Sequence, residues 1–391
     1  MAAPVLGLRG TGSFTADTIR PKNYREGILL LFPNASAPLT ALLSKLSEQA
    51  TDDPEFKWFE KLLPDQRSTL VTNAVTTATA LALTTAADYT KFKPGHVVLN
   101  VNTGEIMWIV SSVSGFINVV RAQGSVVATA IGSADPILVI GSAYSEGDGV
   151  SDAITYDPTI VSNYTQIFRN VFDITGTASA TRIRYGDGQF QKEARREALE
   201  LHSIEMERAF LFGAKTENLT FGSQPTRTTG GLQNFVTTNV TDFSGNVDID
   251  TWENVLQDVF KDGSSEKLAL VGNRTLNTLN KVARAHYTIE ATPTDKTYGM
   301  SMTTWITPYG TLQVKQHPLL SRDTDFNDWG FIVDPAKIKY RYLRGRDTQY
   351  RENVQNPGDD AIKNEFMTEC GLEINHETAH AVIKNLTNFA A

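Results

Sequence analysis

The sequence predicts an α+β protein in which a β-rich region, a long helix and a mixed α/β region follow one another. Residues 68–143 alternate with period two, are rich in Val, Ile, Thr and Ala, and are punctuated by turn sequences. Gln189–Phe212 contains neither Gly nor Pro, which predicts one long helix. After residue 231, amphipathic helical segments mix with β-prone segments. A chain of 391 residues has room for about two or three such domains.

The composition indicates a folded globular protein, with 41% hydrophobic and 20% charged residues. The net charge of −8 means that no overall field attracts nucleic-acid phosphates. The single cysteine, Cys370, excludes an intramolecular disulfide and suits a reducing compartment. The N-terminal residues lack the pattern of a signal peptide, and no apolar run approaches the length of a membrane span. We therefore expect neither export by a signal peptide nor a membrane partner.

The first 37 residues contain apolar side chains, among them Phe14, Ile19 and Tyr24, without a helical or alternating period. Such a segment cannot build a core of its own, so we expect an arm that docks on another surface. A short amphipathic helix is predicted next, because Ser36 can cap it and leucines between 39 and 46 recur at helical spacing.

The β-rich region is expected to form a small barrel or sandwich of consecutive antiparallel strands. The predicted strands are His96–Val101, Glu105–Val113, Phe116–Ala122 and Pro136–Ile140. A Gly-rich, acidic joint at 145–149 follows them, and 154–175 then resumes a strand pattern.

The long helix has a candidate cap at Asp187 and a stop at Gly213. Pairs of opposite charge, such as Glu205 with Arg208, lie at helical spacing on it. Its expected buried positions are Phe190, Ala194, Leu201, Ile204 and Phe210.

The C-terminal part alternates helices and strands. Helices are expected at 250–259 and around Leu276–Val282, and strands at 267–271, 303–307, 311–316, 329–333, 337–343, 371–375 and 381–386.

The sharpest chemical motif is His376-Glu377-Thr378-Ala379-His380, which matches the zinc-peptidase pattern of two histidines and a general base. A catalytic zinc needs a third protein ligand, and the residues after His380 include no His, Asp, Glu or Cys. The flanking residues also read as strand rather than helix. We therefore interpret the motif as structural, and keep a zinc peptidase using His376, Glu377 and His380 as an alternative function.

Three further patterns are interpreted as structural. The segment 323–334 begins like a calcium loop but has Asp328 where that loop needs glycine. Gly186 and Gly188 precede a helix without completing a phosphate-binding motif. Arg341, Arg344, Arg346 and Arg351 gather positive charge, but Asp347 and Glu352 lie among them, which favours salt bridges within or between subunits.

The order of elements resembles that of a major capsid protein of a tailed bacteriophage, of the Hong Kong 97 type. It is similar to the short-tailed-phage head proteins that contain an inserted β region, and the resemblance spans nearly the whole chain. The stretches that carry it are Phe56-Lys57-Trp58, Gly230-Gly231-Leu232, Leu268-Ala269-Leu270-Val271-Gly272-Asn273, and Val333-Asp334-Pro335 before 338–344.

The resemblance implies five regions. They are an N-terminal arm with a short helix at 1–60, an extended-loop region at 61–186 with an inserted all-β module at about 88–143, a spine helix that starts the peripheral domain at 187–231, an axial domain at 232–345, and return strands at 346–391. Subunit contacts are then expected at Phe14, Ile19, Tyr24, Tyr156, Tyr164, Phe168, Arg341, Arg344 and Arg346.

The implied function is structural: self-assembly, through hexamers and pentamers, into an icosahedral or prolate shell in the host cytoplasm. The resemblance implies no catalytic residue, metal or cofactor. The shell would enclose double-stranded DNA without sequence-specific binding, and its partners would be a portal, a possible cement protein and a separate scaffolding protein. A separate scaffold is expected because the chain has no additional coiled-coil segment before the arm. A second alternative is a monomeric β-module protein that binds carbohydrate or a host surface.

Overall fold

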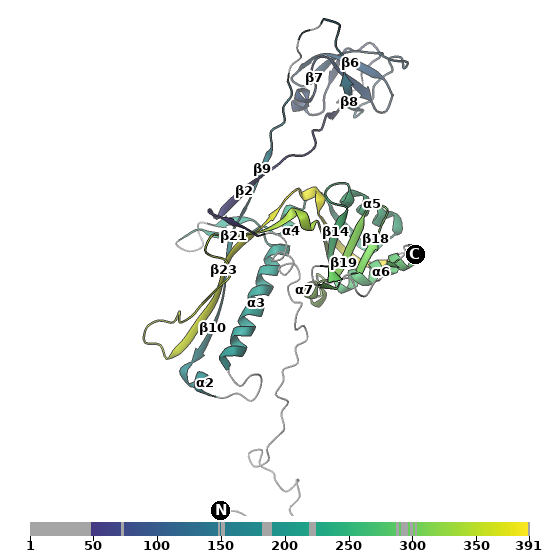
Figure 1. The fold of residues 1–391 in the computed structure, drawn as a ribbon. Coiled ribbons are helices and arrows are strands. Elements are labelled where there is room, and N and C mark those ends of the chain that lie inside the picture. Colours follow the sequence, from purple (N-terminus) through teal and green to yellow (C-terminus); the bar gives the residue numbers. More distant parts are fainter. Residues whose placement is uncertain are drawn as a thin grey trace, which may run out of the picture. The chain divides into compact units, whose positions relative to one another are not determined.

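The chain divides into two compact units, which are described separately below (Figure 1). The computed structural model describes residues 48–71, 74–147, 149, 153–181, 190–218, 224–286, 289–290, 296–297, 300–301 and 303–389. The predicted arm, with Phe14, Ile19 and Tyr24, and the helix expected after Ser36 lie outside these residues. One unit, here called the barrel unit, is Phe59–Ile160, and the other, here called the two-sheet unit, comprises the residues up to Trp58 and from Val161 onward. Within the described residues, no helix has the length and apolarity needed to cross a membrane.

The barrel unit contains six strands in the order β3-β8-β5-β6-β7-β4. Their bounds are β3 (Arg67–Thr69), β4 (Ala80–Ala82), β5 (His96–Asn100), β6 (Ile106–Val113), β7 (Phe116–Val120) and β8 (Pro136–Ser142), and the 3-10 helix η2 (Ala86–Lys91) follows β4. An antiparallel bridge joins Leu70 to Leu83, and the Val71 N–H donates to the Ala82 carbonyl at 3.0 Å. Because these residues extend the two outermost strands, the bridge closes the sheet into a barrel.

The interior of the barrel follows from strand alternation. Every second side chain, such as Val98, Met107, Ile109 and Val119, points into one apolar core. The four strands predicted from the sequence are present with small shifts at their ends, and β3 and β4 complete the barrel. The boundaries of the unit, at Phe59 and Ile160, differ from the ranges 61–186 and 88–143 expected for the extended loop and its β-module.

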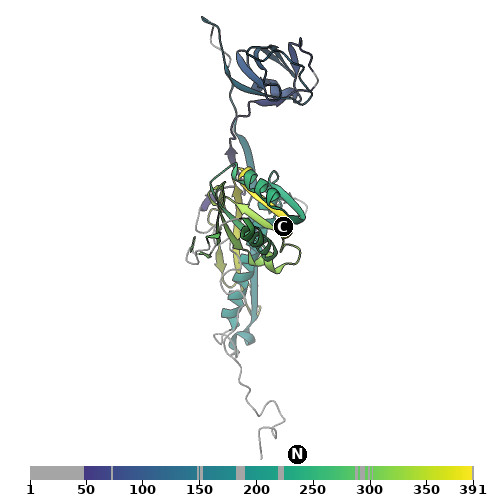
Figure 2. The same cartoon turned by 90° about the vertical axis from the view of Figure 1, so that its right-hand side faces the viewer.

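The two-sheet unit begins with a five-stranded sheet, in which β1, β21, β23 and β10 are neighbours and β22 also pairs with β23. The strands are β1 (Glu48–Thr51), β10 (Gln166–Thr175), β21 (Ile338–Leu343), β22 (Gln349–Arg351) and β23 (Ala361–Ile374). Helix α3 (Phe190–Phe212) runs along β10 and β23, after the short helix α2 (Gly176–Ala180) (Figure 1 and Figure 2). The strands that lead into and out of the barrel unit, β2 (Glu55–Glu60) and β9 (Thr159–Tyr164), pair with each other.

The second sheet has the order β13-β24-β20-β14-β19-β18-β15. Its strands are β13 (Val240–Val247), β14 (Glu266–Val271), β15 (Ile289–Glu290), β18 (Thr303–Ile306), β19 (Thr311–Gln316), β20 (Gly330–Val333) and β24 (Ala381–Phe389). The helices of this part are α5 (Ile249–Phe260), α6 (Asn273–His286) and α7 (Pro318–Arg322). The remaining elements are β11 (Thr216–Asn218), β12 (Thr226–Thr228), α4 (Leu232–Phe235), β16 (Lys296–Thr297), β17 (Met300–Ser301), η3 (Pro335–Lys337) and η4 (Glu377–Ala379).

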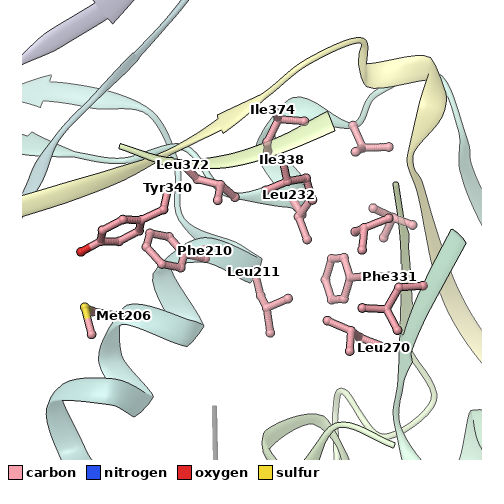
Figure 3. Close-up of a cluster of buried hydrophobic side chains, with 14 of the residues drawn as sticks. Met206, Phe210, Leu211, Leu232, Leu270, Phe331, Ile338, Tyr340, Leu372 and Ile374 are labelled. Carbon is pink, nitrogen blue, oxygen red and sulfur yellow. The ribbon is translucent and has the colours of Figure 1, made fainter. Parts of the chain in front are cut away.

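Two apolar cores lie on opposite faces of the seven-stranded sheet. Ala269 and Val271 of β14 face a core that includes Trp252 of α5. Leu268 and Leu270, which alternate with them, face a second core that also contains Phe210 of α3. Figure 3 shows that this second core brings side chains of α3, of the seven-stranded sheet and of β21 and β23 together. The two sheets and the long helix are therefore one packed body.

Helix α3 confirms the predicted long helix, but its buried face is different. Leu201, expected in the core, is 56% exposed, and Phe190 is also exposed. The residues that α3 buries are Ala198, His202, Met206, Glu207, Phe210 and Leu211. Phe210 is therefore buried as expected, whereas the expectation for Leu201 and Phe190 was wrong. The buried face also includes two polar residues that make internal hydrogen bonds. His202 lies 2.7 Å from the Thr368 hydroxyl, and the Glu207 carboxylate lies 2.7 Å from Nε2 of His317.

Candidate functional site

One face of the five-stranded sheet has a row of buried glutamates beneath basic side chains. Glu365, Glu369 and Glu373 are spaced four residues apart on β23, and an even spacing on a strand places them on one face. All three are buried. The alternate residues of β23, such as Phe366 and Cys370, point to the other face and pack in the cores that involve α3.

Each buried glutamate is paired with cations from neighbouring strands and loops. Glu365 pairs with Arg169 at 2.5 Å and with Arg351 at 3.4 Å. Glu369 pairs with Arg346 at 2.5 Å. The carboxylate of Glu373 accepts a hydrogen bond from Arg341, and the Lys339 ammonium lies 3.4 Å from it. These residues are called the Arg–Glu face below.

The basic side chains of the Arg–Glu face are more exposed than the acids. Arg169 and Arg351 are partly in solvent, whereas the Glu365 side chain is 2% exposed. The carboxylates therefore neutralise the basic side chains from beneath, and the guanidinium groups of Arg169, Arg346 and Arg351 reach the surface. In a chain with a net charge of −8, this gives one sheet face a local basic character.

The structure brings Arg341, Arg346 and Arg351 onto this face, while Arg344 lies beside it. Arg344 is largely exposed and pairs at 3.2 Å with Asp52, which is equally exposed. Asp347, which the sequence placed among these arginines as a salt-bridge partner, has a different partner in the structure. Asp347 accepts a hydrogen bond from the Tyr340 hydroxyl at 2.9 Å, and the described partners of Arg341, Arg346 and Arg351 are the glutamates of β23. Partners far along the chain replace neighbours in sequence because strand pairing aligns β21 and β22 with β23.

The three aromatic candidates have different surroundings. Phe168 is 4% exposed and packs in the unit's own core, with its ring edge-to-face with His202, so it is unavailable for a contact with another subunit. Tyr164 is half-buried and lies under the Lys215 ammonium, 5.3 Å from its ring centre. The Tyr156 hydroxyl is buried and has no hydrogen-bond partner among the described residues. Phe14, Ile19 and Tyr24 lie outside the described residues.

The His376–His380 motif lies on a turn between strands, not on an α-helix. Its central residues form the 3-10 turn η4, and His376 has a left-handed backbone with φ of 53°. The Asp334 N–H donates to Nδ1 of His380 at 3.2 Å, and Nε2 donates to the Asn375 carbonyl at 3.3 Å. Both ring nitrogens of His380 are therefore occupied. Burial, together with the positive charge of Lys267, lowers its pKa to about 4.

Glu377 is equally engaged. Although partial burial opposes it, hydrogen bonds from the side chains and backbones of Thr238 and Thr237 lower the pKa of Glu377. These bonds span 2.5 to 3.3 Å. The carboxylate thus fastens η4 to the segment before β13. The described residues contain no group of three or more His, Cys, Asp and Glu side chains that could hold a metal ion.

Lys267 is the most deeply buried cation near this turn. Its ammonium donates to the carbonyls of Asp262 and Ala379, at 2.9 and 2.5 Å, and burial lowers its pKa to about 8. A cavity of about 310 Å³ lies beside it, lined in part by Ser264, Gln313 and Asp334. Because Lys267 of β14 donates to the main-chain carbonyl of Ala379 in η4, it holds η4 against β14.

The remaining motifs have structural roles or lie outside the described residues. In the segment that begins like a calcium loop, Asp334 is buried and accepts hydrogen bonds from the N–H groups of Ser264 and Ala336. Asp323 accepts one from the N–H of Asp325 at 3.0 Å. Asp187, Gly186 and Gly188 lie outside the described residues.

The glutamate row was missed in the sequence analysis because β23 is longer than expected. A strand was predicted only at 371–375, whereas the structure extends it over Ala361–Ile374. The signal was present in the pattern Glu365-x-x-x-Glu369-x-x-x-Glu373. If that segment is taken as a strand, the spacing predicts one acidic face opposite an apolar face.

The family model described as SU10 major capsid protein matches residues 9–387. The major capsid protein of Pseudomonas phage PaMx41 is 28% identical over 392 residues, covering 93% of this chain and 92% of that protein. Among solved structures, the holo-SrpI encapsulin complex of Synechococcus elongatus gives a TM-score of 0.49 at 11% identity, covering 99% of each chain. The capsid of cyanophage A-1(L) gives 0.45 at 10% identity, covering 95% of this chain and 99% of that one.

Proposed function

Because the chain belongs to the SU10 major capsid protein family, and so forms the capsid shell of a phage, we propose that it builds this shell as a subunit of the Hong Kong 97 type. The family match over residues 9–387 is the observation that carries the shell function. The element order, in which a β-rich region, the long helix α3 and a mixed α/β part follow one another, supports the Hong Kong 97 type.

In this proposal each region of the subunit has its own task. Residues 1–60 form the docking arm, and 61–186 form the extended-loop region, into which the barrel is inserted. The segment 187–231 supplies α3 as the spine of the peripheral domain, and 232–345 forms the axial domain with the seven-stranded sheet. Residues 346–391 return to both sheets, which the pairing of β23 with β10 and of β24 with β13 supports.

We assign the Arg–Glu face, with Arg341, Arg346 and the neighbouring Arg344, to contacts between subunits. Its arginines are held in place from beneath by buried carboxylates, so they are positioned for a partner before it arrives. The complementary surface would be acidic, which a chain with a net charge of −8 provides on its own copies. Tyr156, Tyr164 and the arm residues Phe14, Ile19 and Tyr24 are further contact candidates.

The proposed assembly consists of hexamers and pentamers in an icosahedral or prolate head that is built in the host cytoplasm. A separate scaffolding protein, a portal and a cement protein are the proposed partners of this assembly. The shell encloses double-stranded DNA without reading its sequence, and the subunit uses no cofactor and catalyses no reaction. The alternative function of a zinc peptidase gains no support, since His380 and Glu377 are occupied by internal hydrogen bonds. The alternative of a monomeric host-binding module gains no support from the family match.

The test is assembly of the purified chain, followed by electron microscopy and sedimentation. We expect closed shells from the wild type, and strongly reduced shell yield from the charge reversals Arg344→Glu and Arg346→Glu combined. Lys281→Glu, at an exposed position of α6, is the matched control and should leave the yield unchanged. A normal yield from the double reversal would refute the role of the Arg–Glu face, and a wild type that stays monomeric in all conditions would contradict self-assembly.

A further inference from the structure

The outer surface of the barrel unit between His96 and Ser142 exposes no charged side chain. The charged residues of this segment are Glu105, Arg121 and Asp135. The Glu105 and Arg121 side chains are 0% and 5% exposed and form a two-pronged ion pair with contacts of 2.5 and 2.9 Å. Asp135 is also buried and accepts hydrogen bonds from the amides of Asn100 and Asn102. Burial lowers the pKa of His96, which keeps this residue neutral as well.

Apolar side chains occupy the outside of four adjacent strands in this uncharged segment. The register places Trp108 of β6 beside Val120 of β7. On the other side of β6, Leu99 of β5 lies between Ile106 of β6 and Leu138 of β8. Directly paired residues share a face, so these side chains form one continuous surface. We call it the barrel patch and define it by Leu99, Trp108, Val110, Val120, Leu138 and Ile140.

The barrel patch is not needed to fill the barrel. The inward-facing residues of the same strands, such as Met107 and Val119, already make the core. An antiparallel strand with one buried face normally presents polar residues on the other, whereas Trp108 is 46%, Val110 57% and Ile140 49% exposed. A contiguous exposed apolar surface of this kind marks a contact with another molecule.

We propose that the barrel patch binds a neighbouring copy of this chain in the shell. The proposal rests on the proposed shell-building function and adds a second contact surface to it. Copies of a chain with net charge −8 repel one another, and a surface without exposed charge is where two copies meet with the least repulsion. Arg67 of β3, which pairs with Leu138, is an exposed cation at the edge of the patch, while the patch residues themselves carry no charge. Symmetric repetition in a closed shell multiplies a contact that is small in each subunit.

A thiol placed on the patch tests whether another copy covers it. The only cysteine of the wild type is Cys370, which is buried, and burial raises the pKa of its thiol to about 12, so it gives no background. In shells assembled from purified Val110→Cys chain alone, maleimide labelling should be about tenfold slower than in dissociated subunits, because a covered thiol reacts only when the contact opens. Ala87→Cys, at an exposed position of η2, is the matched control and should label at similar rates in both states.

Each outcome has a definite meaning. Equal labelling of Val110→Cys in shells and in subunits would overturn the proposal while leaving the shell function intact. Protection that appears only in complete virions, and not in shells of this chain alone, would also overturn it, because a different protein would then cover the patch. Failure of the wild type to form any shell would refute the proposed function itself, and the patch proposal with it.

A second measurement separates contact from folding. Trp108→Thr combined with Val120→Thr keeps residues that favour strands but makes the patch more polar. We expect the subunit to melt within a few degrees of the wild type and the shells to dissociate at a lower urea concentration. Shells as resistant to urea as the wild type would contradict the proposal.

Discussion

The barrel unit and the five-stranded sheet handle charge in opposite ways. In the barrel, both members of the Glu105–Arg121 pair lie inside, and the outer surface between His96 and Ser142 is neutral and apolar. In the sheet, the glutamates of β23 lie inside, and their arginine partners reach solvent. The same chain therefore presents one surface whose contacts depend little on salt and another whose contacts weaken as salt screens charge.

The largest effect is expected from breaking the ion pair inside the barrel. Arg121→Met leaves the Glu105 carboxylate buried without a counter-charge, which should destabilise the barrel unit by about 3–5 kcal/mol. Arg346→Met, the matched change on the Arg–Glu face, should cost less than Arg121→Met, because the Arg346 side chain is 38% exposed and water can take the place of its guanidinium. Hydrogen exchange of peptides from each unit measures both costs separately. Equal costs would remove the distinction between the two regions.

A second comparison uses two leucines on the same helix. Leu211→Ala should destabilise the two-sheet unit by about 3–5 kcal/mol, because it opens a cavity in the core that joins the helix to both sheets. Leu201→Ala should cost no more than about 0.5 kcal/mol, because that side chain is largely in solvent. Thermal melting of dissociated subunits provides the measurement. A large cost at Leu201 would show that α3 is rotated relative to the described structure.

The third prediction concerns pH. The pKa of His380 is lowered by burial to about 4 in the folded state, so the unfolded chain binds more protons between about pH 6.5 and pH 4. The free energy of unfolding is therefore highest above this range. It falls by up to about 3 kcal/mol as the pH falls through the range, because His380 must then be protonated on unfolding. His380→Gln should flatten this slope in the two-sheet unit while leaving that of the barrel, where His96 titrates, unchanged. An identical slope in the variant would exclude His380 as its source.

The smallest effect is expected at the edge of the Arg–Glu face. Arg344→Ala removes an exposed ion pair with Asp52 and should change subunit stability by less than about 1 kcal/mol. Its effect should appear in assembly instead, as a shell yield that falls less steeply with added salt than the wild-type yield does. Light scattering at several salt concentrations measures this dependence, and an unchanged dependence would show that Arg344 takes no part in the contact.

Much of the fold could be predicted from local sequence signals. Helix α3 was expected at Gln189–Phe212 and spans Phe190–Phe212, because a long run without Gly or Pro has few alternatives. The barrel strands were found because turn sequences separate alternating segments. Long-range pairing was not predictable in the same way. The bridge between Leu70 and Leu83 and the parallel pairing of β13 with β24 depend on residues that no local pattern connects.

The candidate site was predicted only in part, and for a physical reason. The arginines at 341, 346 and 351 were recognised as a group, but their carboxylate partners lie on β23 and meet them only through sheet pairing. Leu201 was placed in the core because apolar residues are assumed to mark the buried face. The buried positions of α3 instead include His202 and Glu207, whose internal partners come from other elements. Errors in predicting the buried face of α3 and the partners of the arginines therefore come mainly from polar residues whose partners lie on other elements.

The closed ring of the barrel has a consequence for synthesis. A shell needs many copies of its subunit at once, so each copy folds among other incomplete copies. A neutral, apolar module with an open strand edge would pair with its neighbours by backbone hydrogen bonds and aggregate. The bridge from Leu70 to Leu83 leaves the six-stranded sheet without such an edge, and side chains alone are then available for contact. Closure of the ring thus allows the barrel unit to expose an apolar surface without exposing a strand edge. Copies can then associate through side-chain contacts, and amyloid-like stacking of strands is disfavoured.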